Sequence, residues 1–487
     1  MQSHLRRLNI IILTGVLLAF WTLFVFAADA QDDIKKSKQR RGPMQPAPAA
    51  VPYQAVDLIL GQPSANSVIF SLLRYDRDAP AVLLYGLQAD TLNQRIDTAL
   101  LNKGIPSELQ LSSLTANTQY YYELRDTDGK QLLAVGAFHT QRPPGSTFTF
   151  TITADSHLDN NADTTLYRRT LANVAADHPD FHIDLGDTFM TGKHASRENA
   201  TQQYLAQRFY FSQLRSPLFL VIGNHDGEEA KQRKGDSDNL AMWAGGMRTR
   251  YFPNPQPDNF YSGNNQPKPD LGLLEDYYAW TWGDALFVVL DPYWEAASSK
   301  NAGRWQLSLG ERQYHWLQET LANSQAKYKM VFVHQLIGGQ DSQGRGGVSA
   351  ASFGEWGGKN ADGSEGFSSH RSGWKLPIHP MLVKYGVNAV FHGHDHLFAT
   401  QELDGIVYQE VPQPAHLGFA APRDAKADGY LSGTILGGSG HIRIHVSAKA
   451  IRVEYVRADL PRDGHTDNNE QVLHHYSIQS TESQPKP

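Results

Sequence analysis

The chain contains no cysteine among its 487 residues. Disulfide bonds, thiolate-bound zinc, iron–sulfur clusters and a thiol nucleophile are therefore excluded. A metal ion bound to this protein must take its ligands from imidazole, carboxylate, amide or water, which suits hard and borderline ions. Histidine is plentiful by contrast, with 20 residues, so nitrogen ligands are available.

An excess of charge of one sign is also missing. The formal net charge is −6 at pH 7, which gives no indication of a nucleic-acid partner. The sequence has no internal repeat, no heptad array and no nucleotide-binding glycine fingerprint. With 40% hydrophobic and 19% charged residues, the composition is typical of a folded body rather than a disordered chain.

One long apolar run is present, at residues 8–26. Arg6 and Arg7 precede it, and Ala28-Asp29-Ala30 follows with the small-residue spacing of a signal-peptidase site. We therefore expect residues 1–30 to be an export signal, which places the folded part in the periplasm or outside the cell. The alternatives are an uncleaved membrane anchor, because the run reaches the minimum length of a span, and a buried helix of a cytosolic protein. Residues 31–52 are rich in Lys, Arg and Pro and predict a solvated linker.

Residues 53–143 predict a small all-β domain. Short β segments separated by turn residues are expected at 56–60, 68–73, 81–85 and 119–124. No helical period of useful length intervenes, which favours an antiparallel sandwich. The stretch around Tyr120 and Tyr122 resembles the tyrosine-corner strand of fibronectin type III-like domains, in which such a tyrosine is structural.

Residues 147–457 show a different pattern, in which β runs alternate with helix-length segments. This pattern predicts an α/β architecture with central sheets flanked by helices. In open α/β sheets, functional residues tend to lie just beyond the carboxyl ends of the strands. Polar residues beyond the predicted strand ends are therefore the first candidates for a site. Residues 458–487 are polar and predict a C-terminal tail.

Five polar clusters each follow directly after a predicted strand. They are Asp155-Ser156-His157, Gly186-Asp187, Gly223-Asn224-His225-Asp226, His334, and Gly393-His394-Asp395-His396. The glycines permit tight turns and close backbone approach. Any one cluster by itself is ordinary for a surface turn or, in the case of the lone histidine, for a core position. The five together, in this order and each at a strand end, indicate one shared site.

This order of motifs resembles the calcineurin-like metallophosphoesterase superfamily, whose pattern is Asp-x-His, Gly-Asp, Gly-Asn-His-Asp/Glu, a single His and Gly-His-x-His. The likeness covers roughly residues 148–456. A fibronectin-like module placed before the phosphoesterase is similar to purple acid phosphatases. Two departures separate this chain from those enzymes: Phe189 stands in the Gly-Asp motif, where they carry a metal-bound tyrosine, and His157 is present where they lack a ligating histidine. We therefore expect a dinuclear phosphoesterase that is not purple.

The resemblance implies two divalent or trivalent metal ions, with Fe, Mn and Zn as the leading candidates. The ligands carried over by motif are Asp155, His157, Asp187 and His396 for one ion, and Asp187, Asn224, His334 and His394 for the other. Asp187 would bridge the two ions, and a metal-activated hydroxide would attack phosphorus. His225 would contact the phosphate or protonate the leaving oxygen, with Asp226 orienting its ring. The alternative is that His225 only supports Asn224.

A glycine-rich insertion lies between the fourth and fifth motifs, with 11 glycines in residues 338–373. From this position we expect it to arch over the metal ions as a substrate-contacting lid, with His370 and Arg371 as phosphate contacts. The alternative is a glycine-rich surface loop packed by its tryptophans.

Together these motifs predict an exported, metal-dependent phosphoric-ester hydrolase that acts on a small-molecule phosphate ester. A phosphomonoesterase is the simplest assignment. A phosphodiesterase or nucleotidase is the alternative, because one dimetal core serves both classes and fold likeness does not choose between them. An extracellular binding or adhesion protein with a vestigial hydrolase domain is an alternative of another class. The oligomeric state is not predicted.

Overall fold

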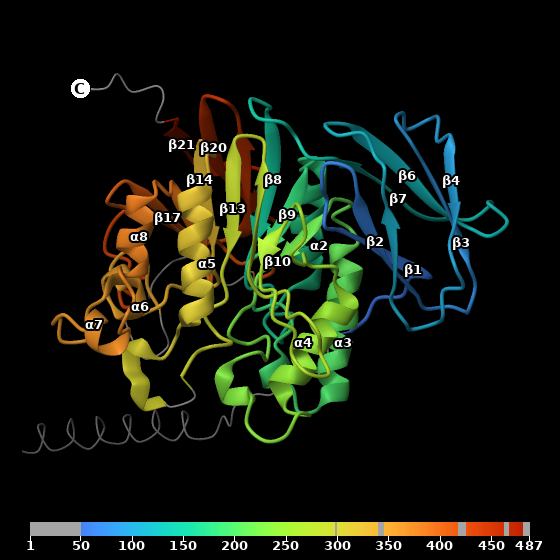
Figure 1. The fold of residues 1–487 in the computed structure, drawn as a ribbon. Coiled ribbons are helices and arrows are strands. Elements are labelled where there is room, and N and C mark those ends of the chain that lie inside the picture. The colour runs from blue at the N-terminus through green and yellow to red at the C-terminus, as the bar shows by residue number, and fades with distance from the viewer. Residues whose placement is uncertain (1–49, 298–299, 339–344, 417–424, 462–466, 481–487) are drawn as a thin grey trace, which may run out of the picture. The chain divides into compact units, whose positions relative to one another are not determined.

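The computed structural model describes residues 50–297, 300–338, 345–416, 425–461 and 467–480 (Figure 1). The predicted export signal, and all but the last three residues of the predicted linker, lie outside the described residues. Within the described ranges, no helix is both long and apolar enough to cross a membrane.

Two antiparallel sheets form between residues 56 and 139, as the prediction of an all-β segment requires. The first has the order β1-β2-β5 and consists of β1 (Val56–Gly61), β2 (Val68–Arg74) and β5 (Ser107–Leu111). The second has the order β4-β3-β6-β7 and consists of β3 (Ala81–Gly86), β4 (Gln94–Asp97), β6 (Gln119–Asp126) and β7 (Leu132–His139). The hydroxyl of Tyr120 accepts a hydrogen bond from the N–H of Thr115 at 3.0 Å. Buried side chains of both sheets, among them Phe70, Leu83 and Phe138, share one core.

Two larger sheets follow in the chain and pack against each other. The first has the order β10-β9-β8-β19-β20-β21 and consists of β8 (Phe148–Thr153), β9 (Phe181–Asp184), β10 (Leu218–Leu220), β19 (Ser439–Val446), β20 (Ala450–Ala458) and β21 (Val472–Gln479). The second has the order β11-β12-β13-β14-β15-β17-β16-β18 and consists of β11 (Ser262–Gly263), β12 (Tyr278–Trp282), β13 (Ala285–Val289), β14 (Tyr328–Phe332), β15 (Ala389–His392), β16 (Phe398–Leu403), β17 (Ile406–Glu410) and β18 (Thr434–Leu436). Aromatic rings fill the space between the sheets: the ring centroid of Phe287 lies 5.1 Å from that of Phe150 and 5.2 Å from that of Phe181.

Helices cover the outer faces of both sheets, which confirms the predicted α/β architecture (Figure 1). On the side of the first sheet, α2 (Thr164–Ala176) packs against β19 and β20, and α3 (Arg197–Phe211) and α4 (Leu240–Tyr251) share an apolar cluster with it. The helices on the second sheet are α5 (Gly310–Asn323), α6 (Gly354–Gly357) and α8 (Ile378–Lys384). The start of α2 is set by Asp163, whose carboxylate accepts the N–H groups of Thr165 and Leu166.

The segment predicted as a polar C-terminal tail contains a strand, so that prediction was wrong. β21 pairs antiparallel with β20 at the edge of the first sheet. Leu473, Tyr476 and Ile478 pack against the core between the sheets. A strand with one solvated face keeps polar side chains on that face. The sequence of β21 therefore has polar residues between its apolar ones and looks like a polar tail.

A buried arginine joins α3 to the N-terminal strands. Nε of Arg208 donates to Oδ1 of Asp57 at 2.8 Å, and Nη1 donates to the hydroxyl of Ser71 at 3.1 Å. The guanidinium also donates to the carbonyl of Tyr251. Neither Arg208 nor Asp57 has an exposed side chain. Since an unpaired charge in such surroundings is strongly unfavourable, this ion pair holds α3 and β1 together.

Replacing Arg208 with methionine should lower the free energy of unfolding by about 3–5 kcal/mol, because the Asp57 carboxylate is left buried without its counter-charge. Urea unfolding followed by circular dichroism measures the loss. Arg95→Met is the matched control, since Arg95 pairs with Asp97 at 2.6 Å on the surface and its removal should leave the unfolding midpoint unchanged. Equal midpoints for the two variants would contradict the importance of the buried pair.

Candidate metal centre

The five polar clusters converge at one edge of the two large sheets. In the first sheet, Asp155, Asp187 and Asn224 follow β8, β9 and β10, which run parallel. In the second sheet, the single histidine His334 follows β14, and the Gly-His-x-His motif follows the parallel β15. The carboxyl ends of parallel strands share one edge of a sheet, so residues far apart in the sequence meet there. The site lies where the motif positions predicted it.

The loops at this edge adopt conformations that are uncommon for residues other than glycine. Positive φ values between 54° and 82° occur at Asp155, His157, Asp187, His394 and His396. Backbone strain of this kind is concentrated at functional sites. Glycine is needed where two loops touch: a Cβ on Gly223 would lie 2.0 Å from the backbone N of Asp187, and a Cβ on Gly393 would lie 2.6 Å from Oδ2 of Asp155.

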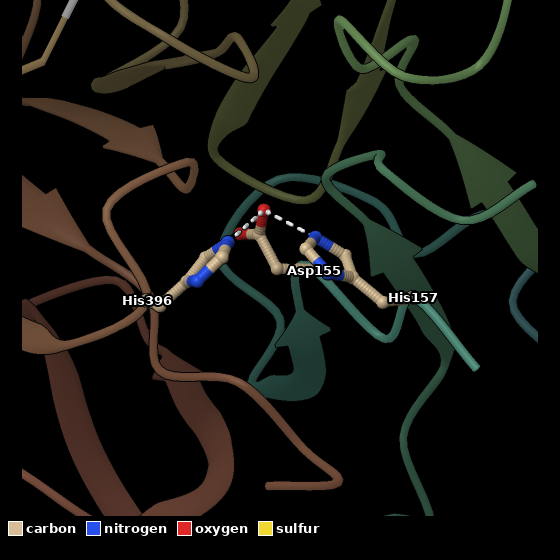
Figure 2. A group of neighbouring side chains, drawn as sticks. All are labelled: Asp155, His157 and His396. Carbon is tan, nitrogen blue, oxygen red and sulfur yellow. Dashed lines mark ion pairs between the residues drawn. The ribbon is translucent and has the colours of Figure 1, made fainter. Parts of the chain in front are cut away.

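Asp155, His157 and His396 form the first group of neighbouring ligand atoms (Figure 2). Oδ1 of Asp155 lies between the two imidazoles, 3.6 Å from Nε2 of His157 and 3.4 Å from Nε2 of His396. Asp155 is completely buried, yet its Oδ1 and the Nε2 of His157 have no hydrogen-bond partner among the described residues. Buried polar atoms are normally satisfied, so this pair of atoms fits a bound cation.

Asp187, His334 and His394 form the second group. Nε2 of His334 is 3.5 Å from Oδ1 of Asp187 and 3.1 Å from Oδ1 of Asn224. Nδ1 of His334 donates to the carbonyl of Leu185 at 2.8 Å. This bond leaves Nε2 as the nitrogen with the lone pair, which is the usual arrangement of a metal-binding histidine.

Asp187 lies between the two groups and faces both of them. Its Oδ1 faces His334, while its Oδ2 is 3.5 Å from Nε2 of His157. One carboxylate oxygen toward each group fits a bridging ligand. The donor set consists of imidazole, carboxylate and amide groups, which suit borderline ions. All seven side chains predicted as metal ligands are thus brought together in one site.

His225 lies beside Asp187 without belonging to either group. Its Nε2 is 3.9 Å from Oδ2 of Asp187, and its backbone N–H donates to Oδ1 of Asp187 at 2.8 Å. The His225 side chain is 27% exposed, whereas that of His334 is fully buried. Burial lowers the pKa of His225 to about 4, although the Asp187 carboxylate acts in the opposite direction. Because its side chain is partly exposed, the His225 imidazole is accessible from solvent at the edge of the ligand groups.

Asp226 has a different role from the one predicted. Its Oδ1 accepts the backbone N–H groups of Thr188 at 2.9 Å and Phe189 at 2.7 Å, and its Oδ2 accepts those of Asp187 at 3.1 Å and Gly223 at 2.7 Å. Among the described residues, the hydrogen-bond partners of the Asp226 carboxylate do not include the imidazole of His225. The expectation that Asp226 orients the His225 ring is therefore wrong. Asp226 instead ties the loop after β9 to the loop after β10.

Side chains that belong to none of the five motifs hydrogen-bond to the loops that carry the candidate ligands. On α3, Gln203 donates to the carbonyl of His157 at 2.5 Å, and Gln207 donates to the hydroxyl of Ser156 at 2.8 Å. Asp184, at the end of β9, is completely buried, which raises its pKa to about 7. No sequence signal marks these residues, because their partners come from other parts of the chain.

A third group of ligand-type atoms lies next to the first and was not predicted. It consists of His157, Asp159 and His416. Nδ1 of His157 is 3.6 Å from Oδ2 of Asp159, and Nε2 of His416 is 3.5 Å from Oδ1 of Asp159. Asp159 comes two residues after the first motif. His416 comes from the segment after β17, where no motif identifies it.

The predicted phosphate contacts in the glycine-rich insertion have other partners. Nε of Arg371 is 2.5 Å from Oε2 of Glu355, which is completely buried and requires a counter-charge. The ring of His370, at the end of α7 (Phe367–His370), stacks on Trp305 with centroids 4.3 Å apart. The Arg371 guanidinium also lies over Trp305 and Trp374. These contacts favour the alternative interpretation, a loop packed by tryptophans, while phosphate contacts by Arg371 and His370 stay a prediction.

A family model described as calcineurin-like phosphoesterase matches residues 148–398, which is more than half of the chain. The chain therefore belongs to the calcineurin-like phosphoesterase family and is a phosphoesterase. The fold of this family implies divalent metal ions, and the His and Asp groups at the sheet edge provide candidate ligands.

Two solved structures share this fold at low sequence identity. The structure of PhoD has a TM-score of 0.63 and 14% identity, and the match covers 87% of this chain and 90% of that chain. Purple acid phosphatase PPD1 from yellow lupin (Lupinus luteus) seeds has a TM-score of 0.58 and 15% identity, covering 89% of this chain and 77% of that chain. Likeness at this identity concerns the fold alone. No curated protein matches the chain.

Replacing Asp226 with asparagine should loosen the two loops, because an amide NH₂ group would face backbone N–H donors. We expect a loss of about 1–3 kcal/mol in the free energy of unfolding and a lower content of bound metal. Urea unfolding and plasma mass spectrometry measure the two effects. Asp163→Asn is the control, since asparagine caps a helix as well as aspartate does. Wild-type stability and metal content in Asp226→Asn would show that Asp226 is not an anchor.

Proposed function

We propose that this protein is an exported phosphomonoesterase with a dinuclear metal centre. The observation that carries the proposal is the position of Asp187, whose two oxygens face two separate groups within one buried site. The proposed ligands are Asp155, His157, Asp187 and His396 for one ion, and Asp187, Asn224, His334 and His394 for the other. Fe, Mn and Zn are the proposed ions, because they accept imidazole and carboxylate ligands without thiolate.

Each side chain of the site would contribute differently to the binding of a phosphate ester. When bound, the metal ions supply positive charge and Lewis acidity at the phosphoryl group. Asp187 shares its negative charge between the two groups. Asn224 contributes an oxygen without charge, so less negative charge faces the phosphate on that side. The Leu185 carbonyl holds His334 in the tautomer whose Nε2 lone pair points into the site.

His225 is the proposed contact to the phosphate or acid for the leaving oxygen. Because burial lowers its pKa to about 4, the acid role requires the negative charge of a bound phosphate ester to raise that pKa. Its imidazole is partly exposed, lies beside Asp187 and is outside both ligand groups. The competing role is support of Asn224, whose Nδ2 lies 3.3 Å from Nδ1 of His225. A proton donor in this position would help most when the leaving oxygen is strongly basic.

Export and domain division are further parts of the proposal. The basic start, the apolar run and the small-residue site within residues 1–30 support export, so that the enzyme would meet small-molecule phosphate esters in the periplasm or outside the cell. We assign residues 53–143 to an all-β domain of fibronectin type III-like kind. The phosphoesterase domain begins at residue 147 and extends past residue 457, because β21 belongs to its first sheet.

The full-length protein should contain at least two metal ions per chain and should hydrolyse an aryl phosphate monoester faster than the corresponding diester. Plasma mass spectrometry and release of the aryl alcohol measure these properties, and EDTA should abolish turnover. Asp187→Asn should lose at least one ion, because the carboxylate serves both groups, while Asp163→Asn should keep both.

Three outcomes would change the assignment. Faster hydrolysis of the diester would make the protein a phosphodiesterase. A protein with two bound ions that hydrolyses neither ester would favour the binding protein or a narrow substrate. Full metal occupancy in Asp187→Asn would contradict the bridging role.

His225→Ala should keep both metal ions, because the backbone N–H that bonds Asp187 remains in the variant. Its kcat should fall by about 10²–10⁴, the usual contribution of a positioned proton donor. The loss should be larger for alkyl phosphates than for aryl phosphates, because alkoxides are poorer leaving groups. Steady-state kinetics with both ester types, together with metal analysis, measure the effect. Parallel loss of metal and activity would assign His225 to the support of Asn224.

A further inference from the structure

We infer that His157, Asp159 and His416 form a third cation site next to the proposed dinuclear centre. The site would take a borderline divalent cation such as Zn²⁺, because it offers two imidazole nitrogens and one carboxylate oxygen. Its three ligand atoms all lie within 4.8 Å of one another. The inference extends the proposed function, since His157 would belong to both sites.

The first argument is the spacing between histidine nitrogens and carboxylate oxygens. In the third group these distances are 3.6 Å and 3.5 Å. They match the 3.4–3.6 Å distances in the first group and the 3.5 Å distance in the second. Two ligands at about 2.0–2.1 Å from a tetrahedral ion lie about 3.3–3.4 Å apart, so this spacing suits atoms arranged around a cation.

Other buried histidines in the described chain contact carboxylates at much shorter distances. Nε2 of His441 is 2.7 Å from Asp177, and Nε2 of His379 is 3.0 Å from Asp404. These distances are those of direct hydrogen bonds. The contacts of the third group, at 3.5–3.6 Å, are longer than these. The group therefore resembles the two ligand groups and differs from the hydrogen-bonded pairs of the same molecule.

The second argument is that the chain holds His416 firmly in place. Its backbone N–H donates to the hydroxyl of Ser439 at 3.1 Å, and that hydroxyl donates back to the His416 carbonyl at 2.9 Å. The neighbouring Ala415 carbonyl accepts the N–H of Asp163 at 2.7 Å. Gln413 donates to the carbonyl of Asp155 at 3.2 Å. The segment that carries His416 is therefore bonded to the loop that carries the first motif.

Burial and charge are also suitable for a cation. His157 and His416 are buried, while the Asp159 side chain is 23% exposed and leaves a path for the ion and for water ligands. The two nitrogens of His157 face opposite sides, with Nε2 toward Asp155 and Nδ1 toward Asp159. Full occupation of both sites requires His157 as imidazolate, so binding releases a proton. The added positive charge would favour dianionic phosphate monoesters over monoanionic diesters.

Titration of the metal-free full-length protein with Zn²⁺ tests the site, with bound metal counted by plasma mass spectrometry after removal of free ions. We expect about three ions per wild-type chain and about two in His416→Ala and in Asp159→Asn. Asp159→Asn keeps the size of the side chain, and thermal unfolding of both variants verifies that they are folded. His379→Ala is the matched control, because it removes a buried histidine from a hydrogen-bonded carboxylate contact and should leave the count at three.

Two results would overturn the third site. One is a wild-type chain that saturates at two ions or fewer. The other is a count of three that persists in both His416→Ala and Asp159→Asn. The dinuclear proposal fails separately: a count of two in every chain leaves it intact while removing the third site, whereas fewer than two ions in the wild type removes both.

Discussion

The candidate centre depends on a buried carboxylate, that of Asp187, placed where the loops of both large sheets meet. A buried negative charge is unfavourable unless cations or hydrogen-bond donors surround it. His157 and His334 face its two oxygens, and the backbone N–H of His225 bonds to one of them. This arrangement requires the loop after β10 to lie against the backbone of Asp187. The approach is so close that only glycine fits at position 223.

The support of this carboxylate extends through the molecule to the N-terminal strands. Asp226 fixes the loop that carries Asp187, and Gln203 and Gln207 of α3 bond to the loop of the first motif. The same helix is attached to β1 through the buried pair of Arg208 and Asp57. The all-β segment therefore packs on the helix that holds the ligand loops.

The local patterns of the sequence predicted which candidate ligand side chains meet at the site better than they predicted the contacts around them. A motif such as Gly-Asn-His-Asp identifies Asn224, because residue type and spacing are contained in a few consecutive positions. The direction of a side chain is not contained there. Asp226 is adjacent to His225 in sequence but bonds to the loop after β9, and Arg371 pairs with the buried carboxylate of Glu355. Both roles are set by contacts between segments distant in the chain.

By itself, the sequence determined the family, the α/β alternation and the seven candidate metal ligands, because each depends on short motifs or on hydrophobic periodicity. Only the tertiary structure decided which residues support those ligands, that β21 completes an edge of the first sheet, and that His416 lies beside Asp159. The physical reason is the same in each case. Such contacts join residues up to hundreds of positions apart, and the packing of the two sheets, rather than any local pattern, brings them within a few ångströms.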